Sequence, residues 1–266
     1  MPTWLYQINP LSAALLLVVV IETVSMIGLF LTRWLILPRL QYHDGANDAV
    51  SGTVQAIGVF YGITVGLIAV GVWNTHSDAA RLVAREAASI GALHRDVSGY
   101  PEPLRTELRS QVREYTVFVI EKAWPAQQAG YGQNVEAGAK IMDELQDKLY
   151  AFQPANPGQV ALHSETLAAY NKLIEYRRLR IDAVDGGLSA TMWVVIWVGA
   201  IISIGIAYFY NIQDPKLHAI LVALMSGLLA MVLFMIVVND KPFFGHVSVS
   251  SDPYKLILER LIDLSR

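Results

Sequence analysis

A single carboxylate, Glu22, stands near the middle of a long apolar segment that covers residues 13–31. A segment of this length and composition is typical of a membrane-spanning helix. An acid at the bilayer centre costs roughly 2.5–3.5 kcal/mol on insertion scales for the comparable Asp. We therefore expect Glu22 to face protein or water. Two roles stay open: an ion or proton site, or a hydrogen bond to a polar group such as Gln55 or Thr64 that holds the helices together. Ser25, one turn away, would join either network.

Small and polar residues recur along a second apolar segment, residues 52–74. Gly58, Gly62 and Gly66 are spaced by four, which lets two helix backbones approach closely. At about 100° per residue, one stripe of this helix holds Ser51, Gln55, Gly58, Gly62, Ala69, Trp73 and His76. The pattern predicts either a tight contact with a neighbouring span or the lining of a central pathway in an oligomer, and the two can coexist. The candidate pathway residues are Gln55, Gly58, Gly62, Gly66 and Trp73.

No residue pattern indicates catalysis or a bound cofactor. The six histidines show no metal-ligand spacing, and the chain has no cysteine to supply a thiolate. Gly130 and Gly132 are not followed by the third glycine or the helix-opening lysine of a phosphate-binding loop. We expect no enzymatic activity, no catalytic residues, no metal and no cofactor. The net charge of −3 gives no basis for nucleic-acid binding.

The elements that position these residues are four apolar segments. The hydrophobic fraction is 54 % and the charged fraction 16 %, against about 45–50 % and about 25 % in average soluble domains. The predicted spans are residues 11–32, 52–74, 188–210 and 215–238. Asp214 and Pro215 suit the start of the fourth span, as an N-cap acid and a proline at the first helical position. Between the second and third spans, residues such as Val83, Ala87 and Ile90 recur at helical spacing, which predicts amphipathic helices.

We therefore predict an all-α, polytopic membrane protein with four transmembrane helices and a large helical cytosolic region. Its parts are residues 1–75 with the first two spans, 76–187 with the helical region, 188–240 with the last two spans, and 241–266 with a tail and a terminal helix. No proline lies between Pro38 and Pro101. The second span can therefore continue unbroken into the helical region, over about residues 52–98.

Basic residues predict the orientation of the chain. The long loop holds 13 Lys and Arg and the tail four, whereas the two short loops together hold three, namely Arg33, Arg39 and Lys216. Basic residues near the ends of spans favour the cytoplasmic side. This places both termini and the long loop in the cytoplasm. The charges of each short loop sum to zero, so neither predicts the sign of a transported ion.

Two blocks of sequence carry a resemblance to a known family. The first follows the second span and comprises residues 61–73, 78–90, 93–95 and 103–105 with Tyr115, and the second is the tail, residues 239–250 and 252–254. Both resemble the bacterial bestrophin-like family, and Glu22 matches an acid that members often carry in the first span. The resemblance implies a likeness to bestrophins, which are homo-oligomeric ion channels with four spans per subunit. Their pore is formed by the second span and narrowed by apolar residues, whereas the stripe through Gln55 and Gly62 holds no triplet of bulky residues.

Two functions follow as hypotheses. The first is a homo-oligomeric ion channel of the bacterial inner membrane, with the second span around a central pore, small ions as its cargo, and a ring of identical subunits in the lipid bilayer. The second is a membrane-anchored scaffold or signalling protein whose cytosolic helices bind a protein partner. The charged helical region, and the lack of any filter motif, favour the second hypothesis.

Overall fold

The computed structural model describes residues 8–40, 43, 45–130 and 135–263, and within them every regular element is helical. Four helical stretches are long and apolar enough to cross a membrane: Pro10–Arg39, Ala46–Val97, Ala190–Ala207 and Pro215–Asp240. The predicted all-α fold with four candidate spans is thus confirmed. The chain divides into two compact units, Met1–Asn74 with Gly187–Asp240 and Thr75–Gly186 with Lys241–Arg266. We call them the membrane unit and the soluble unit.

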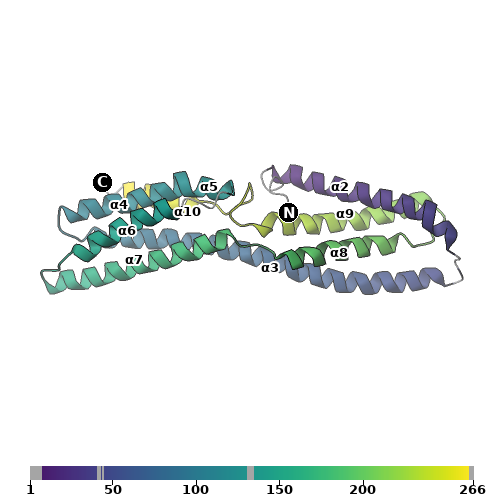
Figure 1. The fold of residues 1–266 in the computed structure, drawn as a ribbon, viewed down its shortest axis with the longest axis horizontal. Helices are drawn as coiled ribbons and strands as arrows, with labels where there is room; N and C mark the ends of the chain where they lie inside the picture. Colours follow the sequence, from purple (N-terminus) through teal and green to yellow (C-terminus); the bar gives the residue numbers. More distant parts are fainter. Residues whose placement is uncertain (1–7, 41–42, 44, 131–134, 264–266) are drawn as a thin grey trace. The chain divides into compact units, whose positions relative to one another are not determined.

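The membrane unit packs four helices side by side (Figure 1). They are α2 (Pro10–Leu31), the first part of α3 (Ala46–Val97), α8 (Ala190–Ala207) and α9 (Pro215–Asp240). A π-helical turn, Thr32–Ile36, and a 3₁₀ turn, Leu37–Arg39, extend α2. Each helix contributes to a buried apolar core, represented by Leu17, Val65, Ile196 and Ala230.

Local sequence signals begin these helices. The side chain of Asn9 accepts a hydrogen bond from the backbone N–H of Leu11, and Ser189 does the same for Met192 at the start of α8. The predicted start of α9 is also found, since Asp214 Oδ1 accepts from the N–H of Lys216 at 2.9 Å. Such caps satisfy backbone donors that have no partner inside the helix.

In the described part of the chain, seven further helical segments form the soluble unit together with the second part of α3. They are α4 (Leu104–Phe118), a π-helical turn (Val119–Ala123) leading into α5 (Trp124–Gln128), α6 (Val135–Ala151), α7 (Pro157–Val184), and α10 (Asp252–Ile257) continuing as a π-helical stretch (Leu258–Asp263). Their core includes Val83, Ile90, Leu108, Leu145 and Leu173, all at most 1 % exposed. The predicted apolar periodicity of α3 therefore marks its buried face.

The tail after α9 is part of this core. Phe243 and Tyr254 lie edge-on to the ring of Trp124, with centroid distances of 5.8 and 5.6 Å. Lys241 Nζ donates to the carbonyl of Gly186 at 2.9 Å. The tail is thus fixed to α5 by aromatic packing and to the end of α7 by a hydrogen bond.

Candidate functional site

The predicted pathway residues lie on an open face of α3. A Cβ atom added at Gly58, Gly62 or Gly66 would have no atom within 4 Å from beyond its own stretch of helix, among the residues that the structure describes. Gln55 is exposed and donates to Ser51 Oγ at 3.4 Å, one turn earlier. Among the described residues of a single chain, the glycine repeat therefore packs against no other span.

The buried face of α3 lies beside this repeat. Val65, Ala69 and Val72 are about 95 % buried against the core, and the hydroxyl of Tyr61 donates to the Ile196 carbonyl of α8 at 2.7 Å. Ala69, which the helical projection placed on the same stripe as Gly58 and Gly62, is thus on the packed side. The predicted stripe is therefore split: Ala69 packs against other helices of the same chain, whereas Gly58 and Gly62 stay open.

Bulky apolar side chains occupy much of the remaining α3 surface. Phe60 is 74 % exposed, Leu67 70 % and Trp73 59 %, and Ile63 and Val70 are exposed as well. A single chain therefore leaves both the glycine repeat and a row of large apolar residues uncovered. Neither surface belongs to the core of the chain.

Glu22 faces α9. Its Oε2 accepts a hydrogen bond from Ser226 Oγ at 3.0 Å, and a Cβ atom at Gly227 would lie 2.8 Å from its Oε1. Serine supplies the donor, and the missing side chain at Gly227 supplies the space. The prediction that Glu22 bonds to Gln55 or Thr64 was therefore wrong; the Thr64 hydroxyl donates to the Phe60 carbonyl within its own helix.

Ser25 belongs to a different contact from the one expected. It is 2 % exposed and is a hydrogen-bond partner of Tyr208. The Tyr208 ring lies where a side chain at Gly28 would be, with its hydroxyl 2.7 Å from an added Cβ atom. Ser25 and Gly28 therefore join α2 to the end of α8, while Glu22 joins α2 to α9.

A charged network closes one end of the membrane unit. Arg33 Nη1 lies 3.0 Å from the Ile212 carbonyl and 3.0 Å from His218 Nδ1. Because a guanidinium only donates, Nδ1 must accept, and the imidazole proton is then on Nε2. Nε2 lies 3.0 Å from the Ala207 carbonyl, to which it donates. The buried, neutral His218 thus links the ends of three helices.

In the soluble unit, three buried side chains converge on the carboxylate of Glu86. Arg180 Nε donates to Glu86 Oε2 at 2.5 Å. The Tyr115 hydroxyl donates to Oε1 at 2.7 Å, and the Tyr254 hydroxyl donates to Oε2 at 3.0 Å. None of the four residues is more than 2 % exposed. We call this the Glu86 cluster; it ties together α3, α4, α7 and α10.

The electrostatics of the Glu86 cluster follow from its burial. Burial, and then the negative charge of Glu86, raise the pKa of both Tyr115 and Tyr254. Burial alone would lower the pKa of Arg180, but the adjacent carboxylate outweighs it and holds that pKa above its ordinary value. The tyrosines therefore stay neutral donors and Arg180 stays a cation. Arg180 Nη1 is buried without a hydrogen-bond partner in the described part of the chain.

The family model of the bestrophin-like domain matches residues 18–254. The chain belongs to the bestrophin-like domain family. The resemblance seen in the sequence is thereby confirmed over nearly the whole chain, and the family with its four apolar helices indicates a channel-like membrane protein. Comparison with curated proteins and with solved structures gives no match.

The bestrophin-like match begins inside α2, before Glu22, and ends at Tyr254. It therefore includes the α3 face and every member of the Glu86 cluster. Sequence reasoning missed that cluster as a site. A signal was present, because Glu86 falls between Val83 and Ile90 on the buried face of α3, where an acid needs partners.

Proposed function

We propose that this bestrophin-like chain is a subunit of a homo-oligomeric ion channel in the bacterial inner membrane, with α3 helices around a central pathway. The open face of α3 carries this proposal. A glycine inside a helix is destabilising by about 0.5–1 kcal/mol relative to alanine, and three of them at a spacing of four leave backbone uncovered. Close approach of α3 from a second subunit gives these glycines a role.

A closed ring lets every subunit bury the same surface in the same way. In that arrangement Gln55, the glycines and Trp73 line or shape the path. The exposed side chains of Phe60 and Leu67 either pack against neighbouring subunits or narrow the path. Glu22 tunes the pathway or holds α2 to α9. We also propose that the protein catalyses no reaction.

The orientation belongs to the same proposal: both termini and the soluble unit face the cytoplasm. The chain contains no cysteine, so single cysteines can be introduced without a background. Glu175→Cys on exposed α7 and Asp48→Cys at the start of α3 are to be labelled with a membrane-impermeant maleimide in intact spheroplasts. We expect labelling of Asp48→Cys only. The reverse pattern would overturn the orientation.

Purified full-length protein in liposomes tests the channel function. We expect passive flux of a small anion or cation, and a ring-sized complex by mass in mild detergent. Gly62→Leu should change both flux and assembly. Gly205→Leu on α8 is the matched control, since a side chain there also meets open space. Failure to pass either kind of ion, or a stable monomer, would refute the proposal.

The scaffold alternative has a distinct signature. Co-purification of one soluble partner at fixed stoichiometry, with no flux, would replace the channel by a membrane-anchored partner-binding protein. Glu22→Gln separates the two roles of that acid. Altered flux with intact assembly would make Glu22 a pathway residue, whereas lost assembly would make it a residue that holds the helices together.

A further inference from the structure

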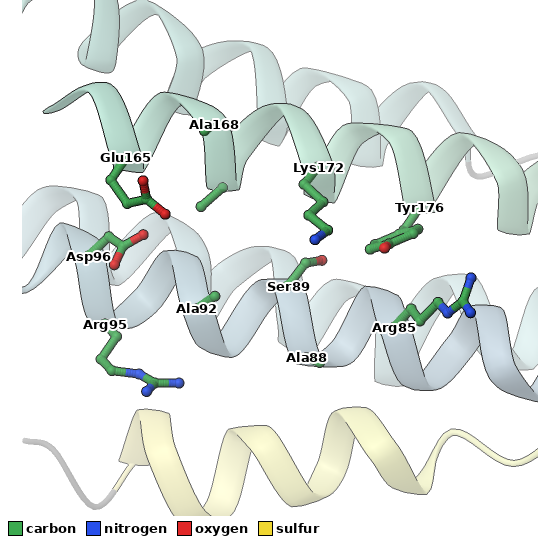
Figure 2. Close-up of a pocket in the computed structure, with 11 residues that line it drawn as sticks. Arg85, Ala88, Ser89, Ala92, Arg95, Asp96, Glu165, Ala168, Lys172 and Tyr176 are labelled. Carbon is green, nitrogen blue, oxygen red and sulfur yellow. The ribbon is translucent and has the colours of Figure 1, made fainter. Parts of the chain in front are cut away.

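A cleft of about 580 Å³ opens in the soluble unit between α3 and α7. Alanines line its middle, with Ala88 and Ala92 on α3 and Ala168 and Ala169 on α7. Their short side chains leave space between the two backbones, which longer residues at the ends enclose (Figure 2). Small-molecule sites have volumes of about 300–1,000 Å³. The cleft is therefore large enough for a small organic ligand.

The two ends of the cleft carry opposite charges. At one end Asp96 of α3 and Glu165 of α7 turn toward each other, and toward the other end Lys172 lies across from Ser89 (Figure 2). Asp96 is seven residues from Ser89 on α3, and Glu165 is seven residues from Lys172 on α7. At a rise of 1.5 Å per residue, seven residues correspond to about 10 Å along the cleft. On α7 the acid Glu165 and the cation Lys172 are thus separated along the cleft, while α3 adds a second acid, Asp96, opposite Glu165 and a neutral hydroxyl, Ser89, opposite Lys172.

The positive end has no carboxylate of its own. Within the described part of the chain, neither Lys172 nor Arg85 has an acidic oxygen within 4.0 Å. The Lys172 ammonium lies 6.0 Å from the centre of the Tyr176 ring. These cations are therefore available to a negatively charged group in the cleft.

The negative end holds two carboxylates, Asp96 and Glu165, and one cation, Arg95. Burial, and then the charge of Glu165, raise the pKa of Asp96, while Arg95 acts in the opposite direction. A ligand cation between the two carboxylates would relieve their repulsion. A simple anion would gain nothing from this end and would be repelled by it, and a simple cation would gain nothing from Lys172.

We propose that this cleft binds a small zwitterionic ligand, with its cationic group between Asp96 and Glu165 and its carboxylate or phosphate at Lys172 and Arg85. The two charges of the ligand are separated by about 10 Å, matching two turns of helix. The site lies within the soluble unit. Its occupancy is therefore measurable whether or not the protein conducts ions.

Triglycine is the probe, because three extended residues span at most about 10–11 Å between a free ammonium and a free carboxylate. Binding to the full-length protein in detergent is to be measured by calorimetry. N-acetyl-triglycine lacks the ammonium, and triglycine amide lacks the carboxylate. We expect saturable binding of triglycine and about tenfold or greater loss of affinity for each derivative, the size expected for one charge-assisted contact.

Two substitutions test which end of the cleft binds the ammonium and which end binds the carboxylate. Glu165 and Lys172 are exposed, so their replacement by glutamine should leave the fold intact. Glu165→Gln should abolish the preference for triglycine over its acetylated form, and Lys172→Gln should abolish the preference over its amide. Glu175→Gln and Arg178→Gln, exposed on the same helix but outside the cleft, are the controls and should retain both preferences. A lack of triglycine binding, equal binding of the derivatives, or equal effects of cleft and control variants would each overturn the proposal.

Discussion

Replacement of Glu86 by glutamine should strongly destabilise the soluble unit. The glutamine oxygen can still accept from Tyr115 or Tyr254, but a neutral amide cannot balance the charge of Arg180. Arg180 is 2 % exposed, and its Nη1 already lacks a partner among the described residues. The substitution therefore leaves a buried cation that water cannot reach.

The magnitude follows from that geometry. Removing one member of a buried ion pair typically costs about 3–5 kcal/mol. For a domain of this size, each kcal/mol lowers the melting temperature by about 2–4 °C. We therefore expect the apparent melting temperature of the soluble unit to fall by about 6–20 °C at a fixed scan rate. Near-ultraviolet circular dichroism is a suitable probe, because Trp124 packs directly against Tyr254.

Two variants make the result specific. Glu175→Gln removes an exposed acid on α7 and should change stability by less than about 0.5 kcal/mol. Glu86→Gln combined with Arg180→Met removes the stranded cation and should recover about 2 kcal/mol of the loss. If Glu86→Gln is no more harmful than Glu175→Gln, or if the double variant is less stable than Glu86→Gln alone, the account of the cluster is refuted.

Three further outcomes follow from the contacts. The pKa values of Tyr115 and Tyr254 are raised in the folded protein, so on raising the pH these tyrosines ionise first in the unfolded chain. Their contribution to the free energy of unfolding is therefore complete below about pH 10 and is lost as the pH rises further. Tyr254→Phe should reduce this alkaline loss of stability, measured as melting temperature at a series of pH values. Gly227→Ala should lower the melting temperature of the membrane unit, because the new methyl group displaces the intramembrane carboxylate from its hydroxyl partner, whereas Gly205→Ala should not. His218→Ala should cost about 1–3 kcal/mol in the same assay, since Arg33 loses a buried acceptor.

The four spans were predictable because the signal for each is local. A run of apolar residues as long as a bilayer is thick is visible without knowledge of any neighbour. The same holds for the start of α9 at Asp214 and Pro215, and for the buried face of α3, where Val83 and Ile90 are completely buried. Caps and amphipathic periods involve residues only a few positions apart.

Partners distant in the sequence were not predictable in the same way. Glu22 bonds to Ser226, 204 residues later, and that choice depends on how far α2 and α9 slide along each other. Likewise, the position of Glu86 indicated that it needed a partner, but nothing local singled out Arg180 among the basic residues of the long loop. Single-sequence patterns determine which face of a helix is buried, whereas the register between helices decides which polar groups meet.

Glu86 and Glu22 differ in how fully their carboxylate oxygens are used, and this difference bears on the proposed function. A carboxylate can accept about four hydrogen bonds. Glu86 accepts four, two from Arg180 and one from each tyrosine, and is 0 % exposed. It has no capacity left for an ion or a proton acceptor role. Glu22 accepts one, from Ser226, and is only partly buried. Because its remaining oxygen lone pairs have no donor among the described residues, Glu22 can still accept a hydrogen bond from water or contact a cation. Glu86 is thus fully used by its neighbours, whereas Glu22 keeps the acceptor capacity that the proposed pathway role would need.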